Sequence, residues 1–146
     1  MTGTHRQVLY SPALLAMAIE LADVPLDASA PYTGRAVSRT CGSVIAFGCS
    51  LDANDSVQDI GLGVAACAVG QAAAAIFANA TPGMTPAQIA DTADRLEDWL
   101  KVSAPSGILP RLSLLEKARD HPARHEAILL PWRAALDALC KAEAPR

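Results

Sequence analysis

Aromatic side chains are scarce in this sequence, at 4% of its 146 residues, although 51% of the residues are hydrophobic. Much of the apolar content is alanine, which favours closely packed helices over a core of bulky rings. No apolar run approaches the roughly 20 residues that cross a bilayer. The net charge of −3 argues against a nucleic-acid surface. We therefore expect one domain over residues 1–146, with no membrane and no nucleic-acid partner.

The sequence motifs of common enzymes are also missing. The chain has no CxxC pair, no HExxH, no phosphate-binding glycine loop and no GxSxG. Its first residues lack the charged start and continuous apolar segment of a signal peptide. We expect a cytoplasmic protein whose four cysteines are reduced thiols rather than structural disulfides.

Short apolar stretches predict three strands, and longer segments with start and stop signals predict helices. Ser11-Pro12 is a helix-start signal, and Pro25 ends that helix near Asp23. The order of elements predicts an α+β fold, a small three-stranded antiparallel sheet with helices packed on one side. The expected strands are 35–40, 43–51 and 56–65, and the expected helices are 12–23, 66–80, one from Pro86 onward, 112–119 and 124–141.

Local signals refine this outline. Irregular alternation after Asp59 indicates a bulge in the third strand. The segment 85–88, TPAQ, is a capping box, and 103–107 has the composition of a linker. Pro131 should kink the last helix or move its start toward Leu130. The expected buried face of the first helix is formed by Leu14, Leu15, Ala18, Leu21 and Ala22.

Cys41 and Cys67 lie at the two ends of the predicted strand pair. If 43–51 and 56–65 form a hairpin, both ends reach the same edge of the sheet, where the two thiols could face each other. Cys67 falls at a predicted helix start, where unpaired amides stabilise a thiolate, and Arg39 could add a positive field near Cys41. A thiolate binds metal or attacks a persulfide, so this pair is the candidate functional site.

The other two cysteines are poorer candidates. Cys49 is expected in the middle of a strand, and Cys140 near the end of the last helix. Neither position reaches the proposed pair readily. We interpret both as small buried hydrophobic residues.

Four short segments form a pattern that covers most of the chain. They are Leu9-Tyr10-Ser11 at the first helix, Cys41-Gly42 before a strand hairpin, Ala66-Cys67-Ala68-Val69 before a small-residue helix, and RHEAILLPWRAAL at 124–136. In this order they resemble four features of the U-type iron–sulfur cluster assembly scaffolds (the NifU N-terminal domain, IscU and SufU). Those features are the chain start, the Cys-Gly-Asp motif, the Gly-Cys-Ala-Ile motif and the third-cysteine segment. The resemblance implies the fold of that family for most of the chain.

The resemblance also implies a ligand set that this chain carries in part. Family members bind zinc or build a cluster with three cysteines and an aspartate, and Cys41 and Cys67 match two of those cysteines. The aspartate that follows Gly42 in the family corresponds to Ser43. The third cysteine corresponds to Ala127.

His125 and Glu126 adjoin the position of the missing cysteine. Either side chain could complete a mixed sulfur, nitrogen and oxygen site. The expected cofactor is therefore an Fe–S cluster or zinc, or none if the site has been lost.

Three functions follow from this resemblance, and the sequence leaves them open. The first is a scaffold or carrier, not an enzyme, that binds iron, zinc or an Fe–S cluster through its cysteines. The second is a non-catalytic binding protein with an eroded site that docks to a cysteine desulfurase or another Fe–S assembly protein. The third is a sulfur relay in which Cys41 or Cys67 accepts a persulfide and passes it on.

Overall fold

The computed structural model describes residues 11–101 and 108–143, with side chains described as far as residue 140. The predicted linker at 103–107 and the Leu9-Tyr10 pair lie outside the described residues. The helices are α2 (Pro12–Ile19), α3 (Ala68–Ala80), α4 (Pro86–Lys101) and α5 (Pro122–Glu143), with 3₁₀ segments η1 (Glu20–Asp23) and η2 (Leu112–Asp120). The strands are β1 (Tyr32–Val37), β2 (Val44–Leu51) and β3 (Val57–Ala65).

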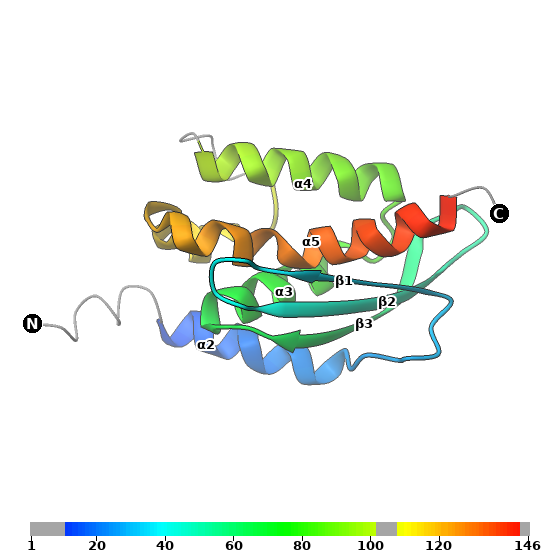
Figure 1. Cartoon of the computed structure of the whole chain (residues 1–146), viewed down its shortest axis with the longest axis horizontal. Coiled ribbons are helices and arrows are strands. Elements are labelled where there is room, and N and C mark those ends of the chain that lie inside the picture. Colours follow the sequence, from blue (N-terminus) through cyan, green and yellow to red (C-terminus); the bar gives the residue numbers. More distant parts are fainter. Residues whose placement is uncertain (1–10, 102–107, 144–146) are drawn as a thin grey trace, which may run out of the picture.

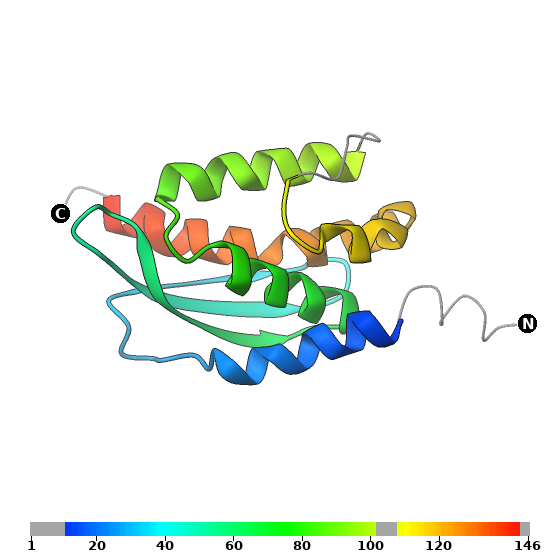
Figure 2. The ribbon, with the colours of Figure 1, turned by 180° about the vertical axis from the view of Figure 1, so that it is seen from behind.

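The three strands form one antiparallel sheet in the order β1-β2-β3. Helices α3 and α5 cover one face of this sheet, α2 packs against α3, and α4 packs against α5 (Figures 1 and 2). The predicted α+β class, with a three-stranded sheet and helices on one side, is confirmed. The first strand was expected at 35–40 but lies at Tyr32–Val37, because the chain turns at Ser38 to close a hairpin loop with Ser43.

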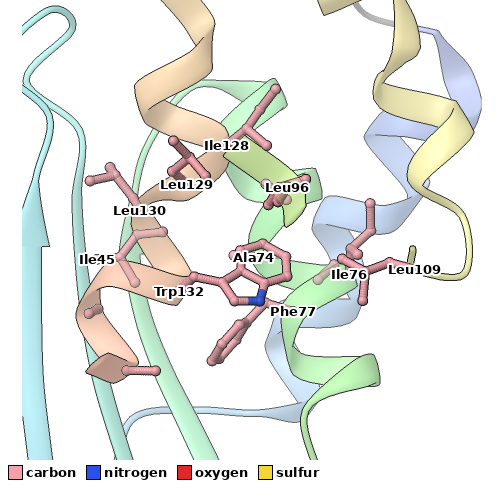
Figure 3. Close-up of a cluster of buried hydrophobic side chains, with 14 of the residues drawn as sticks. Ile45, Ala74, Ile76, Phe77, Leu96, Leu109, Ile128, Leu129, Leu130 and Trp132 are labelled. Carbon is pink, nitrogen blue, oxygen red and sulfur yellow. The ribbon is translucent and has the colours of Figure 1, made fainter. Parts of the chain in front are cut away.

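A small aromatic stack joins the sheet to its helices. The rings of Phe47 in β2 and Phe77 in α3 meet edge to face with centroids 5.6 Å apart, and Phe77 meets Trp132 of α5 in the same way at 5.2 Å. All three side chains are fully buried. Figure 3 shows Phe77 and Trp132 among the aliphatic side chains of α3 and α5. The few aromatic residues of this chain therefore hold the two layers together.

Helix α5 approaches β1 closely enough that a glycine is required between them. A Cβ atom at Gly34 would lie 2.5 Å from the carbonyl oxygen of Ala134 and still nearer to the backbone nitrogen of Ala138. Asp137, also on α5, accepts a hydrogen bond from the backbone N–H of Arg35 at 3.1 Å. The carboxylate thus satisfies a donor that the edge strand would otherwise leave unpaired.

The segment that follows α2 lies on the other face of the sheet. The backbone N–H of Leu62 donates to the carbonyl oxygen of Val24 at 2.8 Å. A Cβ atom at Gly61 would lie 2.5 Å from the carbonyl oxygen of Pro25, and one at Gly48 would lie 3.1 Å from the Ala30 side chain. Small residues on these strands therefore let a loop lie flat on the sheet.

Several local predictions have a clear outcome. Ser11 caps α2 by accepting a hydrogen bond from the backbone N–H of Leu14, as expected. Thr85 and Gln88 exchange hydrogen bonds of 2.9 and 3.3 Å, which confirms the capping box. The register of β2 and β3 shifts opposite Asp59, whose φ is 54°, so the predicted bulge is present.

Two local predictions are wrong in part. Leu14 is buried and Leu21 packs against the core as predicted, but the other buried residue of α2 is Met17, and Leu15 (49% exposed) and Ala22 are exposed. Helix α5 begins at Pro122 and runs through Pro131, so the alternative start near Leu130 does not occur. Buried neighbours on both sides of Pro131 hold the helix together across the missing backbone donor.

Candidate functional site

The strand register brings Cys41 and Cys67 to the same end of the sheet. Val44, the first residue of β2, pairs with Ala65, the last residue of β3. Cys41 lies in the loop that precedes Val44, and Cys67 is the N-cap residue of α3, just after β3. The same end holds the start of α5 (Figure 1). The hairpin that the sequence predicts thus gathers three of the segments that carry the family resemblance.

Cys41 lies in a tight loop that joins β1 to β2. The backbone N–H of Ser38 donates to the carbonyl oxygen of Ser43 at 2.8 Å, and that of Gly42 donates to the carbonyl oxygen of Ser38 at 3.1 Å. Gly42 has a φ of +70°, a conformation that side chains disfavour. This explains in physical terms why a glycine follows Cys41.

Two buried hydroxyl groups contact the sulfur atom of Cys41. The Sγ atom lies 2.9 Å from Ser43 Oγ and 3.3 Å from Ser38 Oγ. Ser38 and Ser43 are 1% and 4% exposed, whereas Cys41 itself is exposed. The thiol therefore rests on a polar base and is open to solvent on its other side.

The surroundings of Cys41 favour its thiolate form. Hydrogen bonds first from Ser38 and then from Ser43, with a smaller effect of the Arg124 charge, lower the pKa of the Cys41 thiol, against the opposing effect of burial. The sequence suggested Arg39 as the nearby cation, and the structure gives that role to Arg124 on α5. Ser38 was not predicted. A serine three residues before a cysteine in a turn is the signal that could have indicated it.

Cys67 occupies the predicted place at the start of α3. Its backbone is extended, and its side chain forms no capping hydrogen bond. The residue is half-buried. Its carbonyl oxygen accepts the first helical hydrogen bond from the N–H of Gln71 at 2.9 Å. Cys67 thus directly precedes the unpaired amides of the first turn of α3, which favour a negatively charged atom or ligand nearby.

The two positions that the resemblance matches to further ligands, Ser43 and Ala127, hold no cysteine or carboxylate. Ser43 presents a hydroxyl group to Cys41. Ala127 is completely buried in α5, and its Cβ lies 3.7 Å from the place that a side chain at Gly70 of α3 would occupy. Gly70 is one helical turn after Cys67, so Ala127 faces the start of α3.

His125 and Glu126 are hydrogen-bonded to the backbone of other segments. His125 Nε2 lies 2.7 Å from the carbonyl oxygen of Arg119, and Glu126 Oε1 accepts a hydrogen bond from the backbone N–H of Arg39. Both residues line a hollow of about 220 Å³ that also includes Thr40. Within residues 11–101 and 108–143, no group of three histidine, cysteine or acidic side chains is placed to hold a metal ion. Ligand roles for His125 and Glu126 stay predictions.

The remaining cysteines differ from each other. Cys49 is fully buried, as predicted, and this burial raises its pKa to about 11. Cys140 is exposed, so its interpretation as a buried hydrophobic residue is wrong. It lies near the end of α5 on the solvent-facing side of the helix, directly after the buried Leu139.

Comparison with solved structures identifies the class of fold. A NifU-like protein (N-terminal) from Brucella abortus, described as nitrogen-fixing, superimposes with a TM-score of 0.82 at 26% sequence identity, covering 94% of this chain and 98% of that one. A putative iron–sulfur cluster assembly scaffold protein for the SUF system from Fervidobacterium islandicum superimposes with a TM-score of 0.80 at 18% identity, covering 91% and 98%. The chain has the fold of the U-type scaffolds, and the resemblance predicted from its sequence is confirmed.

Sequence comparisons alone do not give this result. No family model matches the chain, and no curated protein matches it. The similarity is therefore one of three-dimensional structure and of a few short motifs. None of the helices in the described part of the chain has the length and apolar character needed to cross a membrane.

Proposed function

We propose that this protein acts in cytoplasmic iron–sulfur cluster assembly as a carrier that uses the thiols of Cys41 and Cys67. Its fold is that of assembly scaffolds, which supports a scaffold-type role rather than an enzymatic one. The observation that carries the proposal is the pairing of Val44 with Ala65, which brings both thiols to one end of the sheet. A cysteine desulfurase is the partner that this role implies.

One chain supplies half of the ligands that a complete site requires. Zinc and iron in such sites are held by about four ligands, and this end of the molecule offers two cysteine sulfurs. The others would come from His125 or Glu126 after a rearrangement, from a small thiol in solution or from a second chain. Iron and sulfide, or a whole cluster, are then the cargo of the protein.

Anaerobic reconstitution tests this proposal. The purified protein is mixed with iron and sulfide, and bound metal and the sulfide-to-iron absorption band are measured. We expect bound metal and colour in the wild type, less in Cys67→Ser, and none in the Cys41→Ser, Cys67→Ser double variant. Cys140→Ser is the matched control, because it removes an exposed thiol that lies outside the site. Full colour in the double variant would contradict the proposal.

A sulfur relay is a second candidate, and the Cys41 environment favours it. A thiolate at Cys41 would attack the outer sulfur of a desulfurase persulfide. The donor S–S bond would break, the donor cysteine would leave as a thiolate, and a persulfide would form on Cys41 without net oxidation. Hydroxyl donors from Ser38 and Ser43 stabilise the attacking thiolate and supply no metal ligand comparable to a carboxylate.

Intact-mass analysis separates the relay from the carrier. After incubation with a cysteine desulfurase and cysteine, a relay protein gains one sulfur atom, and Cys41→Ser abolishes that gain. No added sulfur on any cysteine would exclude the relay. If a well-folded protein binds neither metal nor sulfur, docking to an assembly partner becomes the remaining function. Desulfurase capture by the double cysteine variant would then demonstrate it.

A further inference from the structure

We propose that the first turn of α5 positions the Cys41 thiol, with Glu126 and Thr40 as the positioning residues. This inference deepens the proposed function, because it concerns how the same thiol is held ready. Two separate connections run between α5 and the loop that carries Cys41. Both involve the residues immediately before Cys41 in the chain.

The first connection is made by a carboxylate. Glu126 Oε1 accepts a hydrogen bond from the backbone N–H of Arg39. This N–H belongs to the loop between β1 and β2, and a charged acceptor binds it more strongly than a neutral one would. Glu126 therefore fixes the backbone two residues before Cys41, a role quite different from the metal ligand that its sequence position suggests.

The second connection is a chain of hydroxyl groups. Thr40 Oγ1 donates to the carbonyl oxygen of Ala123 on α5 at 3.3 Å, and since a hydroxyl has a single proton, it must accept from Ser38 Oγ, 3.0 Å away. While Cys41 is a thiol, Ser38 Oγ accepts from its backbone N–H at 3.4 Å and from the thiol at 3.3 Å. In this form the Cys41 sulfur is linked through Ser38 and Thr40 to the backbone of α5. Once the thiol loses its proton, the Ser38 hydroxyl turns from Thr40 to donate to the thiolate, and Thr40 keeps its hydrogen bond to α5.

These connections set the orientation of the hydroxyl groups around the sulfur. Cys41 is already exposed, so solvent access does not limit its reactions. What α5 supplies is a loop in which the hydroxyl groups of Ser38 and Ser43 are held against Sγ. Without that support, the loop would sample arrangements in which the Ser38 and Ser43 hydroxyl groups no longer lie against Sγ, and the Cys41 sulfur would lose its fixed position.

The rate of Cys41 alkylation by iodoacetamide, in metal-free protein at one neutral pH, tests this role. Peptide mass spectrometry assigns the label to each cysteine, and exposed Cys140 at the far end of α5 serves as an internal standard. We expect a several-fold lower rate for Cys41 in Glu126→Ala. Glu126→Gln should restore the rate, because the amide oxygen still accepts from Arg39. Thr40→Val should lower the rate, and Thr40→Ser should restore it.

Asp137→Ala is the matched control. Asp137 also accepts a backbone N–H of the β1 edge, but at Arg35, away from Cys41. We expect its removal to leave the Cys41 rate unchanged. An unchanged rate in Glu126→Ala, an equal loss in Glu126→Gln, or an equal loss in Asp137→Ala would each overturn the proposal. Because no metal is present, failure here is distinguishable from failure of the carrier function.

Discussion

At the scale of single residues, Cys41 and Cys49 show how two cysteine thiols in one protein can differ in reactivity. Cys41 is exposed, and two hydroxyl donors lower its pKa. Cys49 is completely buried in β2 among apolar side chains, and burial raises its pKa to about 11. The thiolate is the reactive form of cysteine. Burial therefore makes Cys49 inert, and the hydroxyl donors make Cys41 the more reactive of these two thiols.

Burial of Cys49 should weaken the fold at alkaline pH. The unfolded thiol ionises at its ordinary pKa of 9.0, whereas the folded one keeps its proton to about 11. Above 9.0 the unfolded state therefore binds fewer protons, and the free energy of unfolding falls by up to about 1.4 kcal/mol per pH unit. We expect Cys49→Ala to lack this part of the decline. Urea unfolding in reductant, from neutral pH to about pH 10, measures both slopes, and parallel slopes would disprove the assignment.

At the scale of elements, the fit between β1 and α5 depends on a single missing side chain. The backbone atoms of Ala134 and Ala138 occupy the space where a Cβ at Gly34 would lie. Main-chain atoms of a helix cannot move aside as the end of a flexible side chain can. The distance between β1 and α5 is therefore set by Gly34, and with it the position of α5 beside the Cys41 loop.

Alanine substitution of two strand glycines tests this fit. We expect Gly34→Ala to lower the free energy of unfolding by about 3 kcal/mol, at the upper end of overpacking costs. Gly63→Ala is the control, because its new Cβ would have ordinary contacts of 3.4 Å or more. Its effect should stay within about 1 kcal/mol and could be stabilising. Equal effects in chemical unfolding would show that β1 and α5 have room to separate.

The elements that the sequence predicted well are those with local chemical causes. The Ser11 cap, the Thr85–Gln88 box and the bulge at Asp59 depend on neighbours in the chain. The hairpin that brings Cys41 and Cys67 to one end also follows from local patterning. The end of β1, the exposure of Cys140 and the hydrogen bond of Glu126 depend on where α5 lies, and no short-range pattern contains that information.

At the scale of the whole molecule, the fold gathers the segments that carry the resemblance to the scaffold family. Three segments far apart in the sequence meet at one end: the Cys41 loop, the start of α3 and the first turns of α5 (Figure 1). At this end Ser43 Oγ lies 2.9 Å from Cys41 Sγ, and Ala127 is buried where α5 faces Gly70 of α3. Neither a serine hydroxyl nor an alanine is a usual ligand for zinc or iron. This end of the fold therefore offers two cysteine thiols without the fuller ligand set that the resemblance implies.

Introducing the aspartate and the cysteine that the resemblance implies at positions 43 and 127 should create a complete metal site. Ser43 Oγ lies 2.9 Å from Cys41 Sγ, so a carboxylate there would reach a metal held by Cys41. Ala127 faces Gly70, so a cysteine at this position would bring its sulfur atom close to the first turn of α3. We expect the Ser43→Asp, Ala127→Cys variant to bind about one zinc ion per chain, because zinc prefers about four such ligands. Its zinc affinity, measured by competition with a chromophoric chelator, should exceed that of the wild type at least tenfold, or about 1.4 kcal/mol.

The matched control for this variant is Ser43→Asp, Ala127→Ser, which has nearly the same shape but lacks the added thiolate. It should bind zinc less tightly than the cysteine-containing variant. Zinc should also raise the unfolding temperature of the cysteine-containing variant more than that of the control, because a ligand that binds the folded state stabilises it by mass action. A well-folded double variant with wild-type zinc affinity would mean that the Cys41 loop, α3 and α5 do not bring their side chains within reach of one metal ion. The thiol chemistry of Cys41 would then be the whole function of this end of the molecule.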